Sequence, residues 1–302
     1  MLQRDGFIEE IFKAMKQRQD IYFLSADFGA SALDDLRRDF PNNFVHCGIS
    51  EQNMIDVATG LALEGKNVFC YAMAPFISMR ALEQIKCGPG IMNLPICLIS
   101  VGIGLGYADS GPTHYVTEEF ACLRSIIGIN IFTCSDTVSA RKLAKSIIND
   151  PKFAYVRLDR HQLPDVEVTQ DRNSFRVIGE VSSQRIALIS HGKLLHTCIE
   201  AARKVPGKFF VVDLIQSKPF PLEVVYLLRG VDGVIAVDEQ SPSGAIGSAI
   251  FEACSERDVF PRIINMTLPD EYLFDNIGRE GHLIKHGLSI VNILEQSKRL
   301  SV

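Results

Sequence analysis

No stretch of the 302-residue sequence approaches the roughly 18–20 consecutive apolar residues that cross a lipid bilayer. The first residues, MLQRDG, do not form a charged region followed by an apolar core, so we expect no secretory signal peptide. The net charge of −5 comes without a basic stripe, which argues against nucleic acid or a membrane surface as the main partner. These absences predict a globular protein of the cytoplasm.

The eight cysteines lack any grouping. They are scattered through mostly apolar segments, with no CxxC pair and no cysteine–histidine pair at zinc spacing. This pattern favours reduced thiols that pack as small core residues. We therefore expect neither a disulfide framework nor a metal ion held by this chain.

Three common signatures are absent as well. The sequence has no GxGxxG loop after a strand, no GxxxxGK[ST] phosphate loop and no GxSxG nucleophile turn. The segment 102–106, GIGLG, follows an expected strand, but its spacing does not fit a dinucleotide-binding loop. The chemistry must therefore lie in other segments.

What is present is an alternation of short, continuously apolar runs with stretches of helical periodicity. Unbroken apolar strands are typical of parallel sheets covered on both faces, so the alternation predicts an α/β fold built from βαβ units. The pattern lapses over 162–176, which is polar and contains a proline. We predict two tandem doubly wound domains, at residues 1–170 and 177–302. The expected strands are 21–25, 67–71, 95–101, 130–133, 154–158, 186–190, 209–214, 234–238 and 262–266; the expected helices are 6–16, 51–64, 77–86, 118–126, 138–149, 194–204, 222–229, 245–255 and 289–297.

Three segments carry candidate chemistry, each with a structural alternative. In 44–54 a strand-like piece leads into Ser50 and Glu51, which could simply cap a helix and favour its dipole. In 71–85 a strand ends in small residues and Phe76 opens a helix, where it could be a core residue. In 104–114 a glycine-rich loop ends in His114, and a loop at the carboxyl end of a parallel strand is a common place for function.

Together these segments resemble the carboxy-terminal half of transketolase and its thiamine diphosphate relatives. Residues 25–31 (SADFGAS) resemble the family's SADLTPS, residues 48–52 (GISEQ) its GIREH, and residues 160–164 (RHQLP) its RQNLP. Residues 111–114 (GPTH) are identical to a family motif. The four motifs occur in the family order and span essentially the whole chain. The resemblance implies a pyrimidine-binding domain followed by a transketolase C-terminal domain.

The resemblance also implies a split enzyme. The family's remaining module binds the cofactor's diphosphate through a GDG…N magnesium motif, and no GDG occurs in this sequence. The implied partner is a transketolase N-terminal-section subunit that holds Mg²⁺ and the diphosphate, with two such pairs forming an α2β2-type assembly. The implied cofactor is thiamine diphosphate, and the implied reaction moves a two-carbon ketol unit from a ketose phosphate to an aldose phosphate.

The motifs assign roles to single residues. Glu51 matches the glutamate that hydrogen-bonds the cofactor's aminopyrimidine and promotes deprotonation of the thiazolium ring. Phe76 matches the aromatic residue that stacks on the pyrimidine, and Met73 lies where the family often carries another aromatic. His114 matches a histidine near the substrate hydroxyls, where it would donate hydrogen bonds or transfer a proton.

Other residues match the substrate side of the family site. Arg4, Ser31 and Arg160 match positions that hold the sugar phosphate, a task that suits the planar fork of arginine. Asp109 and Ser110 lie where the family carries an acid that contacts a substrate hydroxyl. The loop before the GPTH motif is two residues longer than the family's GLGEDGPTH, so that acid is displaced.

Two other interpretations of the sequence compete with a function as a transketolase subunit. The β subunit of a 2-oxo acid dehydrogenase E1 component shares the fold, the cofactor and the glutamate, but would not need Arg4, Ser31 and Arg160. A non-enzymatic assembly subunit would not need Glu51 and His114. The sequence does not identify the donor and acceptor sugars, the pathway or the partner chain.

Overall fold

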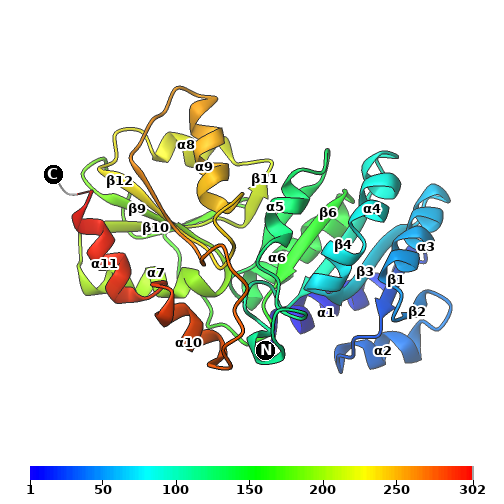
Figure 1. Cartoon of the computed structure of the whole chain (residues 1–302). Coiled ribbons are helices and arrows are strands. Elements are labelled where there is room, and N and C mark those ends of the chain that lie inside the picture. Colours follow the sequence, from blue (N-terminus) through cyan, green and yellow to red (C-terminus); the bar gives the residue numbers. More distant parts are fainter. Residues whose placement is uncertain (301–302) are drawn as a thin grey trace.

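Two sheets organise the chain, and the computed structural model describes residues 1–300 (Figure 1). The first sheet has the strand order β11-β5-β6-β4-β3-β1-β2, and all of its neighbouring strands are parallel except β11, which runs antiparallel to β5. Its strands are β1 (Ile21–Ala26), β2 (Phe44–Gly48), β3 (Asn67–Met73), β4 (Ile96–Val101), β5 (Asn130–Thr133), β6 (Ala154–Leu158) and β11 (Gln216–Lys218). The strands β4 and β6 are buried along their whole length, as their largely apolar sequences predict.

Helices cover both faces of the first sheet. One face packs against α1 (Gln3–Met15), α2 (Ala32–Asp39) and α6 (Thr137–Asn149). The other packs against α3 (Glu51–Leu63), α4 (Leu82–Ile85) and α5 (Glu119–Arg124). Local sequence determines some of the helix ends: Asp136 caps α6 by accepting a hydrogen bond from the backbone N–H of Ser139 at 2.7 Å.

The expected single helix at 77–86 differs in detail. The segment begins as a π-helical turn at Phe76–Arg80, continues as α4 and ends in a second π-helical turn at Lys86–Gly90. Inside the first turn, the Ser78 hydroxyl donates to the carbonyl oxygen of Ala74 at 2.5 Å. Such bonds compete with regular α-helical pairing. The wider turn carries Phe76 and Arg80 at its two ends.

The second sheet has the order β13-β12-β9-β10-β8-β7. Its strands are β7 (Gln170–Asp171), β8 (Arg176–Ile178), β9 (Ile186–Ser190), β10 (Phe209–Asp213), β12 (Gly233–Val237) and β13 (Ile263–Met266). Its helices are α7 (Gly192–Lys204), α8 (Leu222–Leu227), α9 (Ile246–Ser255), α10 (Gly278–Lys285) and α11 (Ile290–Lys298). The segment 162–176, where the sequence pattern lapses between the two predicted domains, thus contributes β7 and the start of β8 to this sheet.

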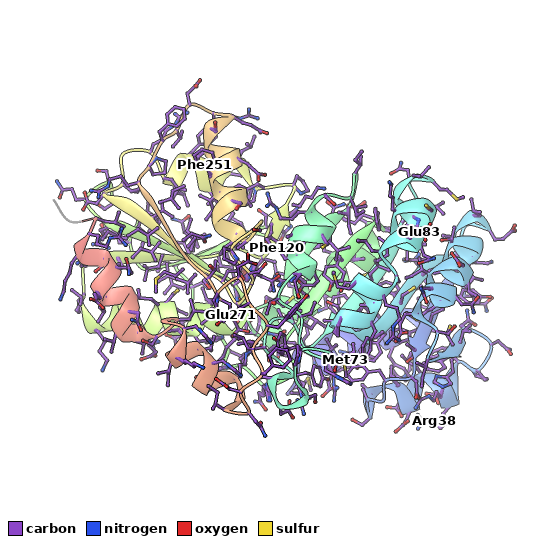
Figure 2. All side chains as sticks on the ribbon, viewed as in Figure 1. Arg38, Met73, Glu83, Phe120, Phe251 and Glu271 are labelled. Atoms are coloured by element: carbon purple, nitrogen blue, oxygen red, sulfur yellow. The ribbon has the colours of Figure 1, made fainter. Side chains whose placement is uncertain are left out.

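Buried arginines join the two domains. Arg157 on β6 donates to Glu119 at 2.9 Å, and its Nη1 lies 3.1 Å from Nε2 of His191 in the second domain. Its guanidinium also lies 4.9 Å from the ring centroid of Phe120, which is completely buried between the domains (Figure 2). Arg176 on β8 reaches back to Asp136 at 2.8 Å. Each arginine pairs with a buried carboxylate, which offsets the free-energy cost of burying that charge.

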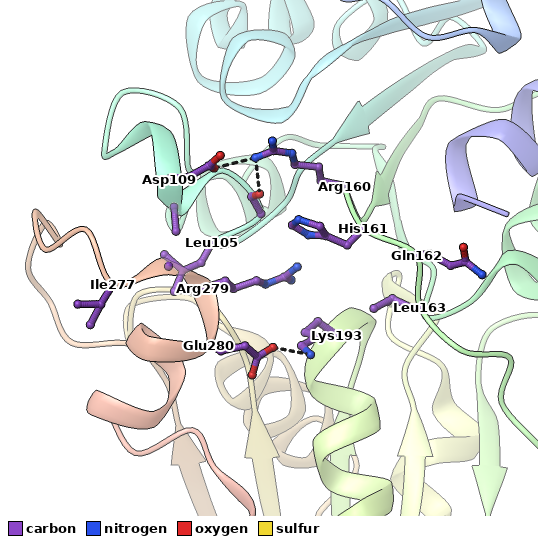
Figure 3. Close-up of a pocket in the computed structure, with 13 residues that line it drawn as sticks. Leu105, Asp109, Arg160, His161, Gln162, Leu163, Lys193, Ile277, Arg279 and Glu280 are labelled. Atoms are coloured by element: carbon purple, nitrogen blue, oxygen red, sulfur yellow. Dashed lines mark hydrogen bonds and ion pairs between the residues drawn. The ribbon is translucent and has the colours of Figure 1, made fainter.

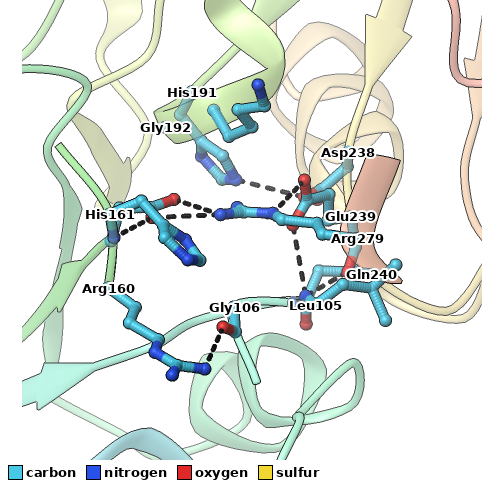
Figure 4. A network of polar contacts seen from close by, with 12 residues as sticks. Leu105, Gly106, Arg160, His161, His191, Gly192, Asp238, Glu239, Gln240 and Arg279 are labelled. Atoms are coloured by element: carbon cyan, nitrogen blue, oxygen red, sulfur yellow. Dashed lines mark hydrogen bonds and ion pairs between the residues drawn. The ribbon is translucent and has the colours of Figure 1, made fainter. Parts of the chain in front are cut away.

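A third arginine, Arg279 at the start of α10, bridges the domains at the edge where the candidate site lies (Figure 4). Its Nη1 lies 2.8 Å from Oδ2 of Asp159, and its Nη2 donates to Oε2 of Glu239 at 2.8 Å. Burial alone would raise the pKa of Asp159, but the charge of Arg279 and hydrogen bonds from His161 outweigh it and hold the pKa at about 2. Asp159 is thus ionised whenever the fold is intact near neutral pH.

The lowered pKa predicts a specific acid sensitivity. A carboxyl group whose pKa is lower in the folded state stabilises the fold above its unfolded pKa, near 3.8, and loses that contribution as the pH falls through about 2. The difference in unfolding free energy between wild type and Asp159→Asn should therefore shrink by about 1 kcal/mol between pH 6 and pH 3, as measured by urea denaturation. A difference that stays constant over this range would contradict the assignment.

Candidate active site

The candidate residues converge because parallel strands end at one edge of a sheet. Glu51 follows β2, Phe76 follows β3, the loop 102–114 follows β4 and Arg160 follows β6. Arg4 joins them from the first turn of α1. The structure gathers most of these side chains into two groups.

The first group surrounds Glu51, the first residue of α3, which is 4% exposed. Its Oε2 accepts a hydrogen bond from Nη1 of Arg80 at 2.7 Å. The Arg80 guanidinium lies 4.1 Å from the ring centroid of Phe76, and the Phe76 ring meets His114 edge to face at 5.6 Å. Glu51, Arg80, Phe76 and His114 therefore form one continuous chain of contacts. Ser50 stands at the N-cap position, but its side chain makes no capping hydrogen bond.

Arg80 was not predicted as a site residue from the sequence. The spacing could have indicated it, because Arg80 lies four residues after Phe76 in an expected helix and the two side chains would share a face. Met73, the last residue of β3, is half-buried at the same sheet edge (Figure 2). The cavity beside Phe76 measures about 410 Å³ and is also lined by Tyr272 and Phe274 from the second domain.

The second group holds the two predicted phosphate-binding arginines. The Arg160 guanidinium lies 4.3 Å from the ring centroid of Tyr107, and its Nη1 donates to Oδ1 of Asp109 at 2.7 Å. Arg4 lies 5.9 Å from the ring centroid of Phe28, which meets Tyr107 edge to face at 6.4 Å. The buried Nε of Arg4 lies 3.4 Å from Oδ1 of Asp5, its neighbour in the first turn of α1. Each of the two predicted phosphate-binding arginines therefore lies next to a carboxylate of this chain.

Ser31 and Ser110 lie outside the two groups of contacting side chains. Ser31 stands at the exposed N-cap of α2, and no hydrogen bond or ion pair joins its side chain to Arg4 or Arg160 within residues 1–300. Ser110 is exposed at the end of the 3-10 turn Ala108–Ser110. The structure thus brings Arg4, Arg160 and Asp109 together and leaves the two serines at the rim.

Buried residues fix the two arginines relative to each other. Gln3, directly before Arg4, is fully buried; its Nε2 donates to the Cys134 carbonyl at 3.0 Å. Its Oε1 accepts from the backbone N–H of Asp159, directly before Arg160, at 2.9 Å. A single amide side chain therefore connects the start of α1 to the end of β6.

The loop after β4 is anchored in the same way. The carboxylate of Glu239 accepts a hydrogen bond from the Leu105 N–H at 3.2 Å while it pairs with Arg279 (Figure 4). At Gly104 a side chain would be strained, because φ is +54° and a Cβ would lie 2.4 Å from the Glu239 carboxylate. Next to this loop, a cavity of about 500 Å³ opens between the domains, lined by Asp109, Arg160 and His161 on one side and Lys193, Arg279 and Glu280 on the other (Figure 3).

Two further features bear on the class of protein. In residues 1–300, no group of three or more His, Cys, Asp or Glu side chains is arranged to hold a metal ion. None of the helices described has both the length and the hydropathy of a membrane span.

Comparisons with known proteins define the class. Residues 2–166 match the family model described as "Transketolase, pyrimidine binding domain", and residues 177–276 match "Transketolase, C-terminal domain". The chain is 31% identical over 277 residues to one of the subunits of the apulose-4-phosphate transketolase of Phocaeicola vulgatus, covering 89% of this chain and 88% of that protein. The corresponding subunit of Actinobacillus succinogenes is 30% identical over 258 residues, covering 82% of each chain.

Solved structures agree on the fold. A structure titled "Split gene transketolase, inactive beta4 tetramer" superposes with a TM-score of 0.86 at 23% identity, covering 99% of this chain and 98% of that one. A transketolase mutant of Pichia stipitis superposes with a TM-score of 0.80 at 16% identity, and there the match covers 99% of this chain but 46% of that one.

The chain therefore belongs to the transketolase family of transferases, and contains its pyrimidine-binding and C-terminal domains. The resemblance found in the sequence motifs and the prediction of two doubly wound α/β domains are both confirmed. The family implies dependence on thiamine diphosphate. The interpretation as a 2-oxo acid dehydrogenase β subunit is not favoured, since these two relatives are transketolase subunits.

The contact between Arg80 and Glu51 yields a prediction about stability. The Glu51 side chain is 5% exposed and that of Arg80 37%, so Arg80→Gln should leave a nearly buried carboxylate unpaired at a cost of about 1–3 kcal/mol. The double variant Arg80→Gln/Glu51→Gln should recover part of that loss, with a coupling energy of about 1 kcal/mol from a denaturation cycle. Arg37→Gln, which breaks an exposed pair with Asp34 at 2.9 Å, is the control and should cost measurably less. Strictly additive losses would contradict the pairing.

Proposed function

We propose that this chain is the second subunit of a split, thiamine diphosphate-dependent transketolase. In this proposal it transfers a two-carbon ketol unit from a ketose phosphate to an aldose phosphate, and only in complex with a subunit that carries the diphosphate-binding domain. The observation that carries the proposal is the contact chain from buried Glu51 through Arg80 and Phe76 to His114, next to a second group with two arginines. The eight unpaired cysteines support a cytoplasmic enzyme.

The first group fits the cofactor's aminopyrimidine ring. Phe76 offers an aromatic face for stacking, and the Glu51 carboxyl offers an oxygen that can share a proton with a ring nitrogen. When bound, thiamine diphosphate supplies a carbon acid at its thiazolium ring and stabilises negative charge on the substrate carbon. The contribution of this chain is to place the Glu51 carboxyl, held by Arg80, at the first residue of α3.

His114 is suited to the substrate rather than to the cofactor's ring. Its edge-to-face contact with Phe76 places it beside the proposed pyrimidine position, and the Thr113 hydroxyl lies 2.8 Å from its Nδ1. If Nδ1 accepts from that hydroxyl, Nε2 carries the proton in the neutral ring. His114 would then donate to a substrate oxygen or transfer a proton there.

The substrate phosphate is assigned to Arg4 and Arg160. They approach Tyr107 and its neighbour Phe28, and a guanidinium can donate two hydrogen bonds to one phosphate. Two of the relatives are named for a sugar phosphate, apulose 4-phosphate. We assign this chain to phosphorylated sugars as a class, with Ser31 at the rim and Ser110 and His114 toward the hydroxyl groups.

The partner subunit is assigned the diphosphate and Mg²⁺, because the family's GDG…N motif is missing from this sequence. The exposed apolar surface beside the Glu51 group supports a second subunit that completes the site. Near Phe76, the side chains of Met79, Tyr272 and Phe274 are 40%, 63% and 79% exposed, which is unusual for large apolar groups beside a cavity. We assign this face to the first subunit, and the complete enzyme to an α2β2-type assembly.

One assay separates the two enzymatic readings. The chain reconstituted with a diphosphate-domain subunit should turn over xylulose 5-phosphate with ribose 5-phosphate. Arg160→Ala should lower kcat/KM for these phosphorylated sugars roughly ten- to a hundredfold, mostly through KM, because a charge-assisted hydrogen bond contributes about 1.5–3 kcal/mol. Arg203→Ala, which removes an exposed pair with Glu200, is the control and should leave the rate unchanged. Turnover of pyruvate with an artificial electron acceptor, and none of the sugars, would overturn the proposal.

A further inference from the structure

Asp109 makes a contact that a role toward substrate hydroxyls does not explain. It lies in the 3-10 turn Ala108–Ser110, within the loop that is longer than its family counterpart. Its carboxylate accepts a hydrogen bond from Nη1 of Arg160 at 2.7 Å (Figure 3). The pair remains open to solvent, since the side chains are 33% and 59% exposed for Arg160 and Asp109.

The loop after β4 holds Arg160 in position and also carries Asp109, the carboxylate that balances its charge. Besides the contact with Asp109, Nη1 of Arg160 donates to the Gly106 carbonyl at 3.4 Å, and the guanidinium lies over Tyr107 at 4.3 Å (Figure 4). All three contacts come from four consecutive residues of one loop. Both hydrogen bonds use Nη1, so Nε and Nη2 have no hydrogen-bond acceptor within residues 1–300.

A carboxylate and a phosphate compete for the same kind of donor. Each presents two oxygens to a guanidinium, and each carries the negative charge that makes the hydrogen bond strong. A phosphate that approached Arg160 would therefore have to replace Asp109 at Nη1, or bind the free nitrogens while it is repelled by the Asp109 charge nearby. In both cases Asp109 weakens the binding of the phosphate.

We propose that Asp109 is an internal competitor for Arg160, and that it sets how strongly the site prefers phosphorylated sugars over unphosphorylated ones. This inference rests on the proposed function and deepens it, because it names the residue that limits the phosphate selectivity of the same site. Asp109 neutralises Arg160 before a ligand binds and is displaced by the phosphate group. The ion pair is exposed, so its effect on affinity is a modest factor rather than an all-or-none switch.

The kinetic experiment compares one sugar with and without its phosphate in the reconstituted complex. Asp109→Asn should lower KM for xylulose 5-phosphate about two- to fivefold, the range of an exposed ion pair, with kcat unchanged. KM for xylulose should not change. Glu280→Gln is the matched control, because it removes a carboxylate from the same cavity whose partner is Lys193 at 2.6 Å rather than Arg160. It should shift neither KM by more than about twofold.

A second measurement does not depend on catalysis. The full chain is titrated with inorganic phosphate while the Nε–Hε signals of its arginines are followed by NMR. Asp109→Asn should tighten phosphate binding by about the same two- to fivefold factor, and Arg160→Ala should abolish the response. Tighter phosphate binding in a complex that transfers no ketol unit would sink the proposed function and leave the inference standing. A KM that rises for both sugars in Asp109→Asn, or phosphate binding that is unchanged by it, would overturn the inference.

Discussion

The buried ion pairs of Arg279 are the interaction on which the candidate site depends. Asp159 is completely buried and Glu239 nearly so, and each would be costly to bury without a cation. Arg279 supplies one charge to both and links α10 of the second domain to two segments that hold the site. The first segment follows β6 and contains Asp159 and Arg160. The second is the loop after β4, in which the N–H of Leu105 donates a hydrogen bond to the Glu239 carboxylate. The domain interface thus sets the position of Arg160 relative to the loop after β4.

The same logic explains why the site is made of loops but is not loosely held. Gln3 connects the residues next to Arg4 and Arg160, and β11 from the second domain adds an edge strand to the first sheet. Arg160 and Asp109, which would lie near the substrate, are partly exposed, whereas Gln3 and Asp159 directly behind them are buried and paired. Buried residues behind the candidate site therefore hold its exposed side chains in place.

Much of this arrangement could be predicted from the sequence, and the reason is topological. Once β3, β4 and β6 are recognised as parallel strands, the residues after them must meet at one edge, which brings Phe76, His114 and Arg160 together. The segment 44–48 was recognised only as a strand-like piece, and its pairing with β1 brings Glu51 to the same edge. The short strands β7 and β11 could not be predicted, because two or three residues carry no periodicity and pair only through tertiary placement. For the same reason the partners of ionic groups escaped prediction. The pairing of Arg80 with Glu51 depends on a π-helical turn, and that of Asp109 with Arg160 on the path of a longer loop.

We propose that this chain supplies Glu51 to a thiamine diphosphate site, and that the site is complete only when a second subunit supplies the diphosphate-binding domain. The most direct measurement is hydrogen–deuterium exchange at the thiazolium C2 of the cofactor, followed by NMR with Mg²⁺ present. Neither subunit should accelerate exchange in isolation, whereas the complex should. A complex containing Glu51→Gln should assemble but exchange at the rate of the free cofactor. Fast exchange on the isolated chain, or undiminished exchange in the Glu51→Gln complex, would contradict this proposal.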